Sequence, residues 1–152
     1  LRIDELLMDK VVSVNQTGAF FLAQACACSM IEIKIPGRLV FISSVSSIFG
    51  GELQIHYTAT KGAMNQMMKS IAIAVGKYGI TANAVLPGWI ATEMTEWLQN
   101  WDAFNDKAIG SVPMRRWGEG KDFAGMAVYF ASDASKFHTG DSVVIDGGYS
   151  IF

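Results

Sequence analysis

The chain has 152 residues, of which 51% are apolar and 17% charged, and its formal net charge is −2. This is one domain's worth of sequence, long enough to bury a hydrophobic core, and the composition excludes a disordered acidic or basic tail. The small net charge gives no electrostatic reason to expect nucleic acid or an anionic membrane as a partner. No apolar run reaches the roughly 18 residues that a membrane span needs, and no secretory leader is recognisable, so we expect a soluble, cytoplasmic protein.

Apolar residues recur at helical or strand spacing along the chain, without repeats or a linker rich in proline and glycine. In chain order, the predicted elements are a helix at 4–33, a strand at 39–42, a helix at 56–78, a strand at 80–86, one or two short helices within 92–109, a helix at 121–132 and a strand at 142–145. Pro36-Gly37, Gly79 and Pro87-Gly88 end three of these elements.

The predicted strands alternate with long helices and are continuously apolar, which is typical of an α/β fold with a parallel sheet covered on both faces. The chain opens in helical rhythm with LRIDELLMDK and has no preceding strand. We therefore expect residues 1–152 to be a single partial domain, with three parallel strands and their helices, cut inside a larger fold. The second long helix is apolar nearly all round, so the face that does not pack on the sheet would be exposed unless a second subunit covers it.

Ser44, Tyr57 and Lys61 form the candidate site. Ser44 follows the apolar strand, at the carboxyl end where parallel sheets bind their ligands. Tyr57 and Lys61 are four residues apart and rise from one face of a helix. A free tyrosine titrates near 10, and a unit charge at about 4 Å supplies about 4 kcal/mol at an effective dielectric constant near 20. An ammonium group can therefore stabilise a neighbouring phenolate, while a hydroxyl holds a carbonyl oxygen. This set suits reversible carbonyl reduction.

Five segments, in this order and spacing, resemble the short-chain dehydrogenase/reductases of the classical type: VNQTGAFF, GRLVFISS, YTATK, ITANAVLPG followed by IAT, and DGG. The resemblance covers residues 12–151 and implies a Rossmann-like, doubly wound parallel sheet. It also implies an NAD(P)-dependent oxidoreductase that interconverts a secondary alcohol and a carbonyl, with hydride transfer at the nicotinamide. GGELQIHYTATK is similar to the sugar and polyol dehydrogenases of the family, and the full-length protein is expected to be a homodimer or homotetramer.

By this resemblance, the catalytic residues are Asn15, Ser44, Tyr57 and Lys61. Tyr57 exchanges a proton with the substrate oxygen, and Ser44 hydrogen-bonds that oxygen. Lys61 holds the nicotinamide ribose and favours the phenolate, and Asn15 sustains a proton-relay water near the lysine. The expected cofactor-binding residues are Tyr57, Lys61, Pro87, Gly88, Ile90 and Thr92. No metal site is predicted.

A complete family member opens with a strand and a glycine-rich turn that bind the dinucleotide, followed by a residue that selects the adenosine ribose. Neither is present here, so the predicted cofactor is NAD or NADP without a readable preference. The chain alone is expected to be weakly active or inactive.

Three smaller expectations concern single residues. Ser43 is an alternative to Ser44, although its hydroxyl is better explained as bonded to the backbone. Ser47 stands where many relatives have glycine. Cys26 and Cys28 are expected to be small buried hydrophobes, because two helical residues at this spacing face different directions and cannot pair.

Other functions are compatible with the same residues. A 3-oxoacyl-thioester reductase shares every motif cited above. An inactive, dimer-forming fragment would explain the apolar helix and the missing cofactor half, but not the retention of Ser44, Tyr57 and Lys61. A sugar-nucleotide epimerase shares the tyrosine and lysine, but the short DGG ending argues against it. We expect a small-molecule carbonyl or alcohol as substrate, and neither nucleic acid nor a membrane as partner.

Overall fold

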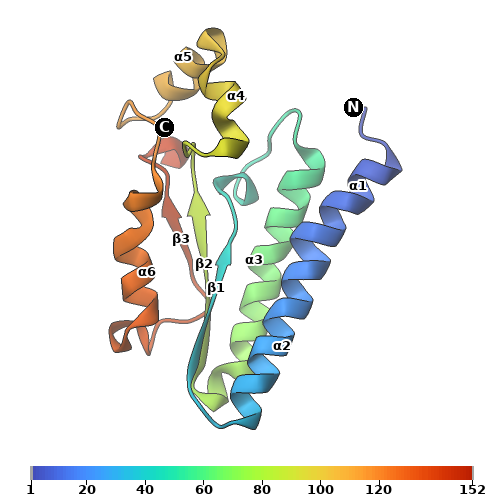
Figure 1. Ribbon diagram of the computed structural model, residues 1–152, viewed down its shortest axis with the longest axis vertical. Coiled ribbons are helices and arrows are strands. Elements are labelled where there is room, and N and C mark those ends of the chain that lie inside the picture. The colour runs from blue at the N-terminus through green and yellow to red at the C-terminus, as the bar shows by residue number, and fades with distance from the viewer. Residues whose placement is uncertain (1, 152) are drawn as a thin grey trace.

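The computed structural model describes residues 2–151, and a three-stranded parallel sheet forms its centre (Figure 1). The strand order is β1-β2-β3, where β1 is Gly37–Ile42, β2 is Ile80–Pro87 and β3 is Ser142–Ile145. Gly37 lies opposite Ile80, and Ala84 lies opposite Ser142. Residues 80–86 of the middle strand are all buried, as the continuously apolar sequence predicts.

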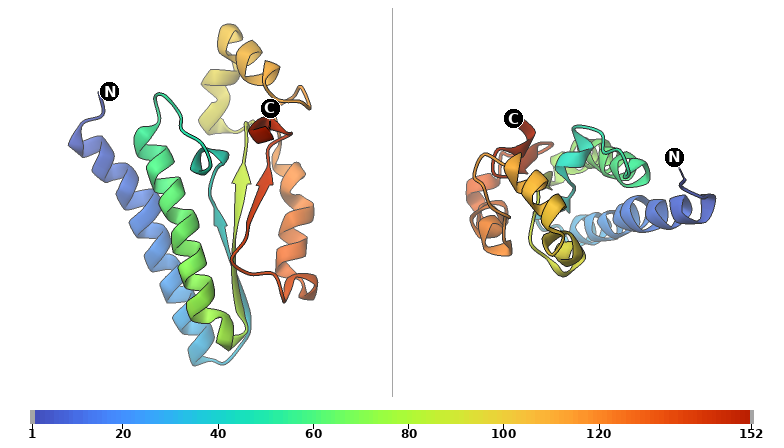
Figure 2. Two further views of the ribbon diagram at one scale, coloured as in Figure 1. Left: turned by 180° about the vertical axis from the view of Figure 1, so that it is seen from behind. Right: turned by 90° about the horizontal axis from the view of Figure 1, so that it is seen from above.

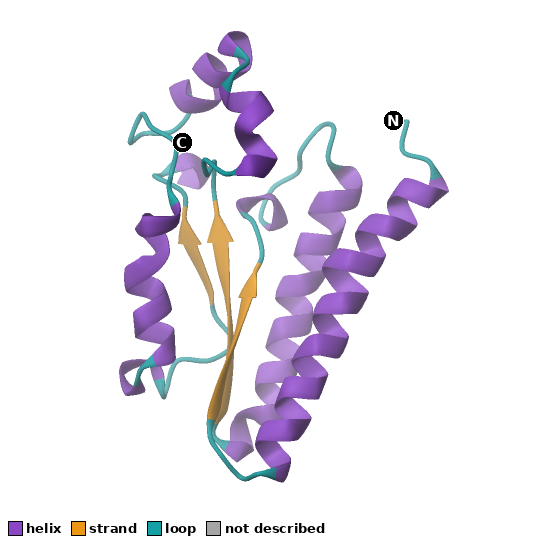
Figure 3. Ribbon diagram, in the orientation of Figure 1, coloured by secondary structure: helices purple, strands orange, loops and turns teal. Residues whose placement is uncertain are grey.

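Helices cover both faces of this sheet (Figures 2 and 3). One face packs against the first two long helices and the other against α6, while two short helices lie beyond the carboxyl ends of the strands. The helices are α1 (Glu5–Val12), α2 (Ala19–Glu32), α3 (Ile55–Val75), α4 (Glu96–Gln99), α5 (Asp102–Gly110) and α6 (Ala124–Ala131). The predicted α/β class, with three parallel strands, is therefore confirmed.

The core lies between α3 and the sheet. Met64, Met68 and Ala72 recur every four residues on α3 and are at most 5% exposed. They meet a middle strand whose Ala82 and Ala84 are fully buried, and these small side chains let the helix approach closely. This packing fixes the position of α3 over the sheet, and α3 carries two of the predicted site residues.

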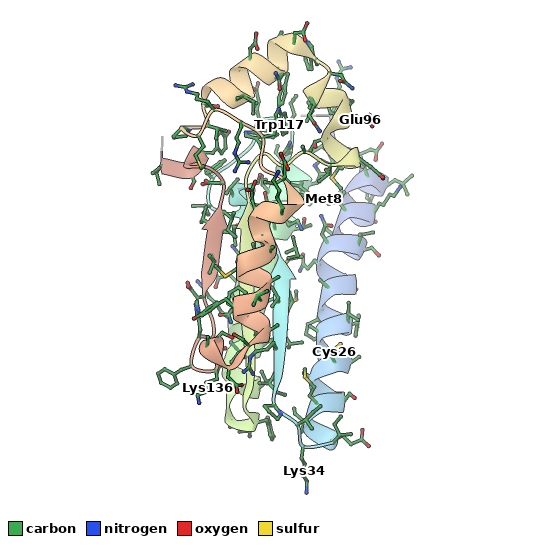
Figure 4. The ribbon with its side chains drawn as sticks, turned by 60° about the vertical axis from the view of Figure 1, so that its left-hand side comes forward. Met8, Cys26, Lys34, Glu96, Trp117 and Lys136 are labelled. Carbon is green, nitrogen blue, oxygen red and sulfur yellow. The ribbon has the colours of Figure 1, made fainter. Side chains whose placement is uncertain are left out.

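Two features of the first long helix differ from the prediction. Residues Ser13–Gly18, between α1 and α2, form a π-helix, a wider turn than the α-helix expected there. Cys26 and Cys28 are exposed rather than buried (Figure 4 labels Cys26 on α2). The buried residues of α2 are Ala23 and Ala27, so the inward face of this helix is narrower than its apolar sequence suggests.

The uninterrupted helix Glu5–Glu32 has 28 residues and, by length and composition alone, is apolar enough to cross a membrane. The expectation that no segment reaches this threshold is wrong, because Gln16 and Gln24 interrupt the apolar run without making the segment polar. Mostly buried core helices of water-soluble proteins and signal sequences near an N-terminus meet the same criterion, and 11% of this window is buried. Here Ala23 and Ala27 belong to the same hydrophobic cluster as Met64 and Met68.

The outer edge of β1 has no strand beside it among residues 2–151. On the same strand, Val40 is 43% exposed and Ile42 is 57% exposed, although the alternating residues Leu39 and Phe41 are buried. An unpaired edge next to exposed β-branched residues is a surface that native proteins usually cover.

Candidate active site

The first turns of α3 carry Tyr57 and Lys61. The Lys61 ammonium nitrogen lies 5.5 Å from the centre of the Tyr57 ring, so the spacing of four residues brings the two groups to one side of the helix as predicted. Lys61 Nζ also donates a hydrogen bond of 2.7 Å to the carbonyl oxygen of Ile42, the last residue of β1. Burial lowers the pKa of Lys61, because the charged form loses hydration there.

Ser44 lies two residues beyond the end of β1, in extended backbone geometry with φ −166° and ψ 154°. It begins the short 3₁₀ turn η2 (Val45–Ser47), and its Oγ accepts a hydrogen bond of 3.1 Å from the Ser46 amide. A hydroxyl can accept and donate at once, so this bond leaves the Ser44 hydrogen available to a substrate oxygen.

Ser43 has a structural explanation. Its hydroxyl donates to the backbone carbonyl of Lys61 at 3.1 Å, and its amide donates to the Val85 carbonyl at 2.8 Å. The interpretation of Ser43 as a serine bonded to the backbone is therefore confirmed. Together with the bond between Lys61 and Ile42, this contact ties the carboxyl end of β1 to the first turns of α3.

Asn15 lies inside the π-helix and points at α3. Its Nδ2 donates to the Thr60 hydroxyl at 3.2 Å, and that hydroxyl donates to the Tyr57 carbonyl at 2.8 Å. Thr60 is only 1% exposed. Sequence reasoning missed Thr60, because the contact joins residues 45 positions apart and leaves no local signal. Asn15 is thus linked through one hydroxyl to the backbone of Tyr57.

The predicted cofactor-binding residues after β2 form a tight connection to the end of β3. A side chain at Gly88 would come within 2.8 Å of the Asp146 Cα, so only glycine allows this approach. Ile90 pairs with Gly118 in an isolated parallel bridge. Thr92 is exposed and begins a short 3₁₀ turn in which its hydroxyl lies 3.3 Å from that of Thr95. Pro87, Gly88, Ile90 and Thr92 thus follow one another along the carboxyl edge of the sheet.

Aromatic side chains cover this edge. Trp89 makes edge-to-face contacts with Phe104 at 5.3 Å, Tyr149 at 5.9 Å and Trp117 at 6.0 Å between ring centres. Trp117 lies below the short helices α4 and α5, near the ends of the strands (Figure 4). A hollow of about 200 Å³ beside Trp89 and Ile90 is lined also by Arg116 and Asp122. The Arg116 guanidinium binds both carboxylate oxygens of Asp122 and lowers the pKa of Asp122 to about 2.

These residues fit the nicotinamide end of a dinucleotide but not its phosphates. Lys61 uses one of its three N–H donors on Ile42, which leaves two for hydroxyl groups such as those of a ribose. Among residues 2–151, by contrast, none of the three strands leads through a glycine-rich turn straight into an α-helix. The turn η2 separates Gly50 and Gly51 from β1, and Gly147 and Gly148 after β3 lead only into a three-residue 3₁₀ turn, Tyr149–Ile151. Within the same residues, no group of three or more histidine, cysteine or acidic side chains could hold a metal.

The parallel strands are covered by helices on both faces, with a serine beyond one strand end and a Tyr–Lys pair on the next helix, which is the architecture of a Rossmann-like α/β fold. A family model described as enoyl-(acyl carrier protein) reductase matches residues 1–150. The chain belongs to the short-chain dehydrogenase/reductase family.

Individual members of the family that resemble this chain include sugar dehydrogenases and acyl-thioester reductases. The chain is 44% identical over 140 residues to the L-rhamnose 1-dehydrogenase (NAD(P)(+)) of Azotobacter vinelandii, covering 91% of this chain and 54% of that protein. It is 36% identical to a 3-oxoacyl-[acyl-carrier-protein] reductase of Mycobacterium bovis, covering 97% of this chain and 59% of that protein. A crystal structure of a putative 2-deoxy-D-gluconate 3-dehydrogenase from Agrobacterium tumefaciens with bound NADP matches with a TM-score of 0.96 at 34% identity, covering 99% of this chain and 61% of that one. The chain therefore spans little more than half the length of the curated relatives it matches.

Proposed function

We propose that the protein carrying this chain is an NAD(P)-dependent oxidoreductase that interconverts a secondary alcohol and a carbonyl on a sugar or polyol. The observation that carries the proposal is the grouping of Ser44 at the strand end with Tyr57 and Lys61 on α3, where the ammonium lies 5.5 Å from the phenol ring centre. The similarity to an L-rhamnose 1-dehydrogenase supports the sugar as substrate class. Residues 1–152 would be the catalytic part of one such domain.

In the proposed reaction, the nicotinamide supplies or takes up the hydride when it is bound. Ser44 donates its hydroxyl hydrogen to the substrate oxygen and so fixes the carbon beside it. Tyr57 takes the proton of the alcohol during oxidation, and returns it to the carbonyl oxygen during reduction. The Lys61 ammonium stabilises the phenolate and donates to the ribose, while Asn15 holds a water that carries the proton onward from the lysine.

The test is a set of turnover assays on the protein expressed from the complete reading frame. L-Rhamnose, D-gluconate and a 3-oxoacyl thioester are offered with NAD(H) and NADP(H), and nicotinamide absorbance is followed. We expect turnover of a sugar, and we expect Tyr57→Phe to lower kcat by about a thousandfold, a much larger effect than its effect on coenzyme binding. Tyr78→Phe, which removes the hydroxyl of an exposed tyrosine after the same helix, is the control.

The other candidate functions give different results in the same assays. A clear preference for the thioester would favour the second candidate, which the 36% identity to a 3-oxoacyl-[acyl-carrier-protein] reductase supports. Unchanged turnover in Tyr57→Phe would contradict the assignment of the proton donor. No turnover with any substrate, in a protein that still self-associates, would favour the inactive dimer-forming fragment.

We also infer that the full-length protein is a cytoplasmic homodimer or homotetramer. Ile73 on α3 is 84% exposed, and Phe21 and Leu22 on α2 are 59% and 68% exposed, so both long helices present apolar groups to the outside. Both cysteines are free, as is usual in a reducing compartment.

A charge placed in that apolar surface tests the oligomer. Because burying an unpaired carboxylate is costly, we expect Ile73→Glu to raise the dissociation constant at least about tenfold in sedimentation equilibrium. Phe137→Glu, at a fully exposed position after α6, is the matched control and should leave association unchanged. Equal association of both variants with the unmodified protein would contradict an interface at Ile73.

A further inference from the structure

One hydrogen-bonded chain connects Ser44 to α3 through two residues outside the predicted site. The Ser47 hydroxyl donates to the Ser44 carbonyl oxygen at 2.5 Å, and the Asn65 Nδ2 donates to the Ser47 hydroxyl at 2.7 Å. The Ser47 amide also donates to the Ser44 carbonyl, at 3.0 Å. The Ser44 backbone is therefore held by both polar groups of Ser47, and Ser47 is held in turn by α3.

The directions of these hydrogen bonds determine one another. A hydroxyl has one hydrogen, and Ser47 uses it on the Ser44 carbonyl, so Ser47 can only accept from Asn65. This fixes the orientation of the Asn65 amide, with its NH₂ group toward Ser47. Its Oδ1 is buried and has no partner among the described residues.

Asn65 belongs to the same stripe of α3 as the predicted catalytic pair. Tyr57, Lys61 and Asn65 follow one another at intervals of four residues and so share a face of the helix. Three successive hydrogen bonds therefore join the carboxyl end of β1 and the turn after it to this face. They are Ile42 to the Lys61 ammonium, Ser43 to the Lys61 carbonyl, and Ser47 to the Asn65 amide.

These hydrogen bonds to α3 add support to η2, which is only three residues long. Short 3₁₀ turns have poor hydrogen-bond geometry and hold their flanking residues weakly. The hydrogen bonds that run from Asn65 through Ser47 to the Ser44 carbonyl oxygen form a clamp on η2.

We propose that Ser47 and Asn65 are positioning residues that hold the Ser44 backbone in a fixed place relative to Tyr57 and Lys61. The inference rests on the proposed function, because Ser44 has to meet the same substrate oxygen as Tyr57. A displacement of about 1 Å in such a constellation can lower the rate by about a hundredfold.

Unfolding equilibria test whether the clamp exists, independently of catalysis. Ser47→Ala, Asn65→Leu and the double variant form a cycle in the protein from the complete reading frame. Asn65→Leu also removes the buried Oδ1 that has no partner among the described residues, and this offsets part of the stability that the variant loses with the hydrogen bond to Ser47. The informative quantity is therefore the coupling free energy between the two substitutions, not the stability change of either single variant. We expect the two changes to be coupled by about fivefold in the unfolding constant. Strictly additive effects would overturn the clamp.

Turnover tests whether the clamp positions Ser44. We expect Ser47→Ala and Asn65→Leu each to lower kcat by about tenfold or more, with the coenzyme KM unchanged and the double variant no worse than either single one, because the two residues act as a unit. Ser47→Thr retains the hydroxyl and should restore most of kcat. Ser70→Ala and Gln66→Leu make the same chemical changes on the exposed side of α3 and should have no effect.

The remaining outcomes separate the two proposals. An unchanged kcat in coupled variants would show that the clamp only stabilises the fold, and would overturn the positioning role. Equal losses in Ser70→Ala and Gln66→Leu would overturn it as well. Absence of turnover in the unmodified protein would overturn both the proposed function and the positioning role. This outcome differs from a failure of the positioning role alone, because then the unmodified protein and all variants would be equally inactive.

Discussion

Lys61 holds an ammonium group that is partly buried. It compensates for this with one hydrogen bond to the Ile42 carbonyl and with its position near the Tyr57 ring. Burial still lowers its pKa below the ordinary value of 10.5. The proposed chemistry needs this arrangement, because a compact cation that is poorly hydrated acts more strongly on a neighbouring phenolate than a fully solvated one.

This burial predicts a pH dependence of stability. Between the lowered folded pKa and 10.5, the unfolded chain binds more protons at Lys61 than the folded chain, so stability rises with pH across that window. The contribution is fully present above 10.5 and is lost as the pH falls through the folded pKa. We therefore expect the unmodified protein to gain stability relative to Lys61→Met as the pH rises toward 10.5, measured by urea unfolding at several pH values. A difference between the two proteins that does not change with pH would contradict the burial of a charged Lys61.

Single residues were predictable where the signal is local. Tyr57 and Lys61 are one helical turn apart, and Ser44 lies two residues beyond an apolar strand, so the sequence alone selects these three residues as candidates. The Ser47–Asn65 and Asn15–Thr60 contacts join residues 18 and 45 positions apart, and tertiary packing decides them. The prediction that Cys26 and Cys28 are buried is wrong for a related reason. The apolar character of a helix does not show which of its faces packs against the rest of the protein.

At the scale of elements, the π-helix Ser13–Gly18 is where the first long helix departs from regular geometry. Asn15 lies inside this wider turn and reaches Thr60 on α3. Segments of this kind are frequent at functional sites, because the extra residue per turn redirects a side chain. The strands and helices themselves follow from the apolar pattern, but no sequence signal marked the π-helix, since its residues keep helical spacing.

Thr60→Val removes the hydroxyl that joins Asn15 to the Tyr57 carbonyl while keeping nearly the same shape. Thr60 is buried, so the Asn15 amide loses its partner in a protein environment, and we expect a loss of about 1 to 3 kcal/mol in the free energy of unfolding. Thr58→Val is the matched control, because the Thr58 hydroxyl donates only to nearby backbone carbonyls at the surface. Equal losses in the two variants would contradict a specific role of the Asn15–Thr60 contact.

At the scale of the whole molecule, the described residues form a sheet in which the outer edge of β1 is unpaired. No strand pairs with the outer side of β1 within residues 2–151, and Val40 and Ile42 are partly exposed there. Within the same residues, no strand leads through a glycine-rich turn straight into an α-helix. Both observations agree with the chain's coverage of 54% of the Azotobacter vinelandii relative.

We therefore expect the 152-residue chain alone to show no binding in nicotinamide fluorescence titrations with NADH and NADPH. A fusion that supplies the part of the Azotobacter vinelandii relative that this chain does not match should bind one or both, because added strands would cover the β1 edge and bring a phosphate-binding turn. In the same fusion, Lys61→Met should weaken binding, since it removes the donors for the ribose, whereas Lys77→Met at an exposed position should not. Tight coenzyme binding or robust turnover by the unfused chain would contradict the idea that the cofactor site is completed from outside these residues. The coenzyme that the fusion prefers would reflect the relative's own selecting residue, so only the protein from the complete reading frame can report the natural preference.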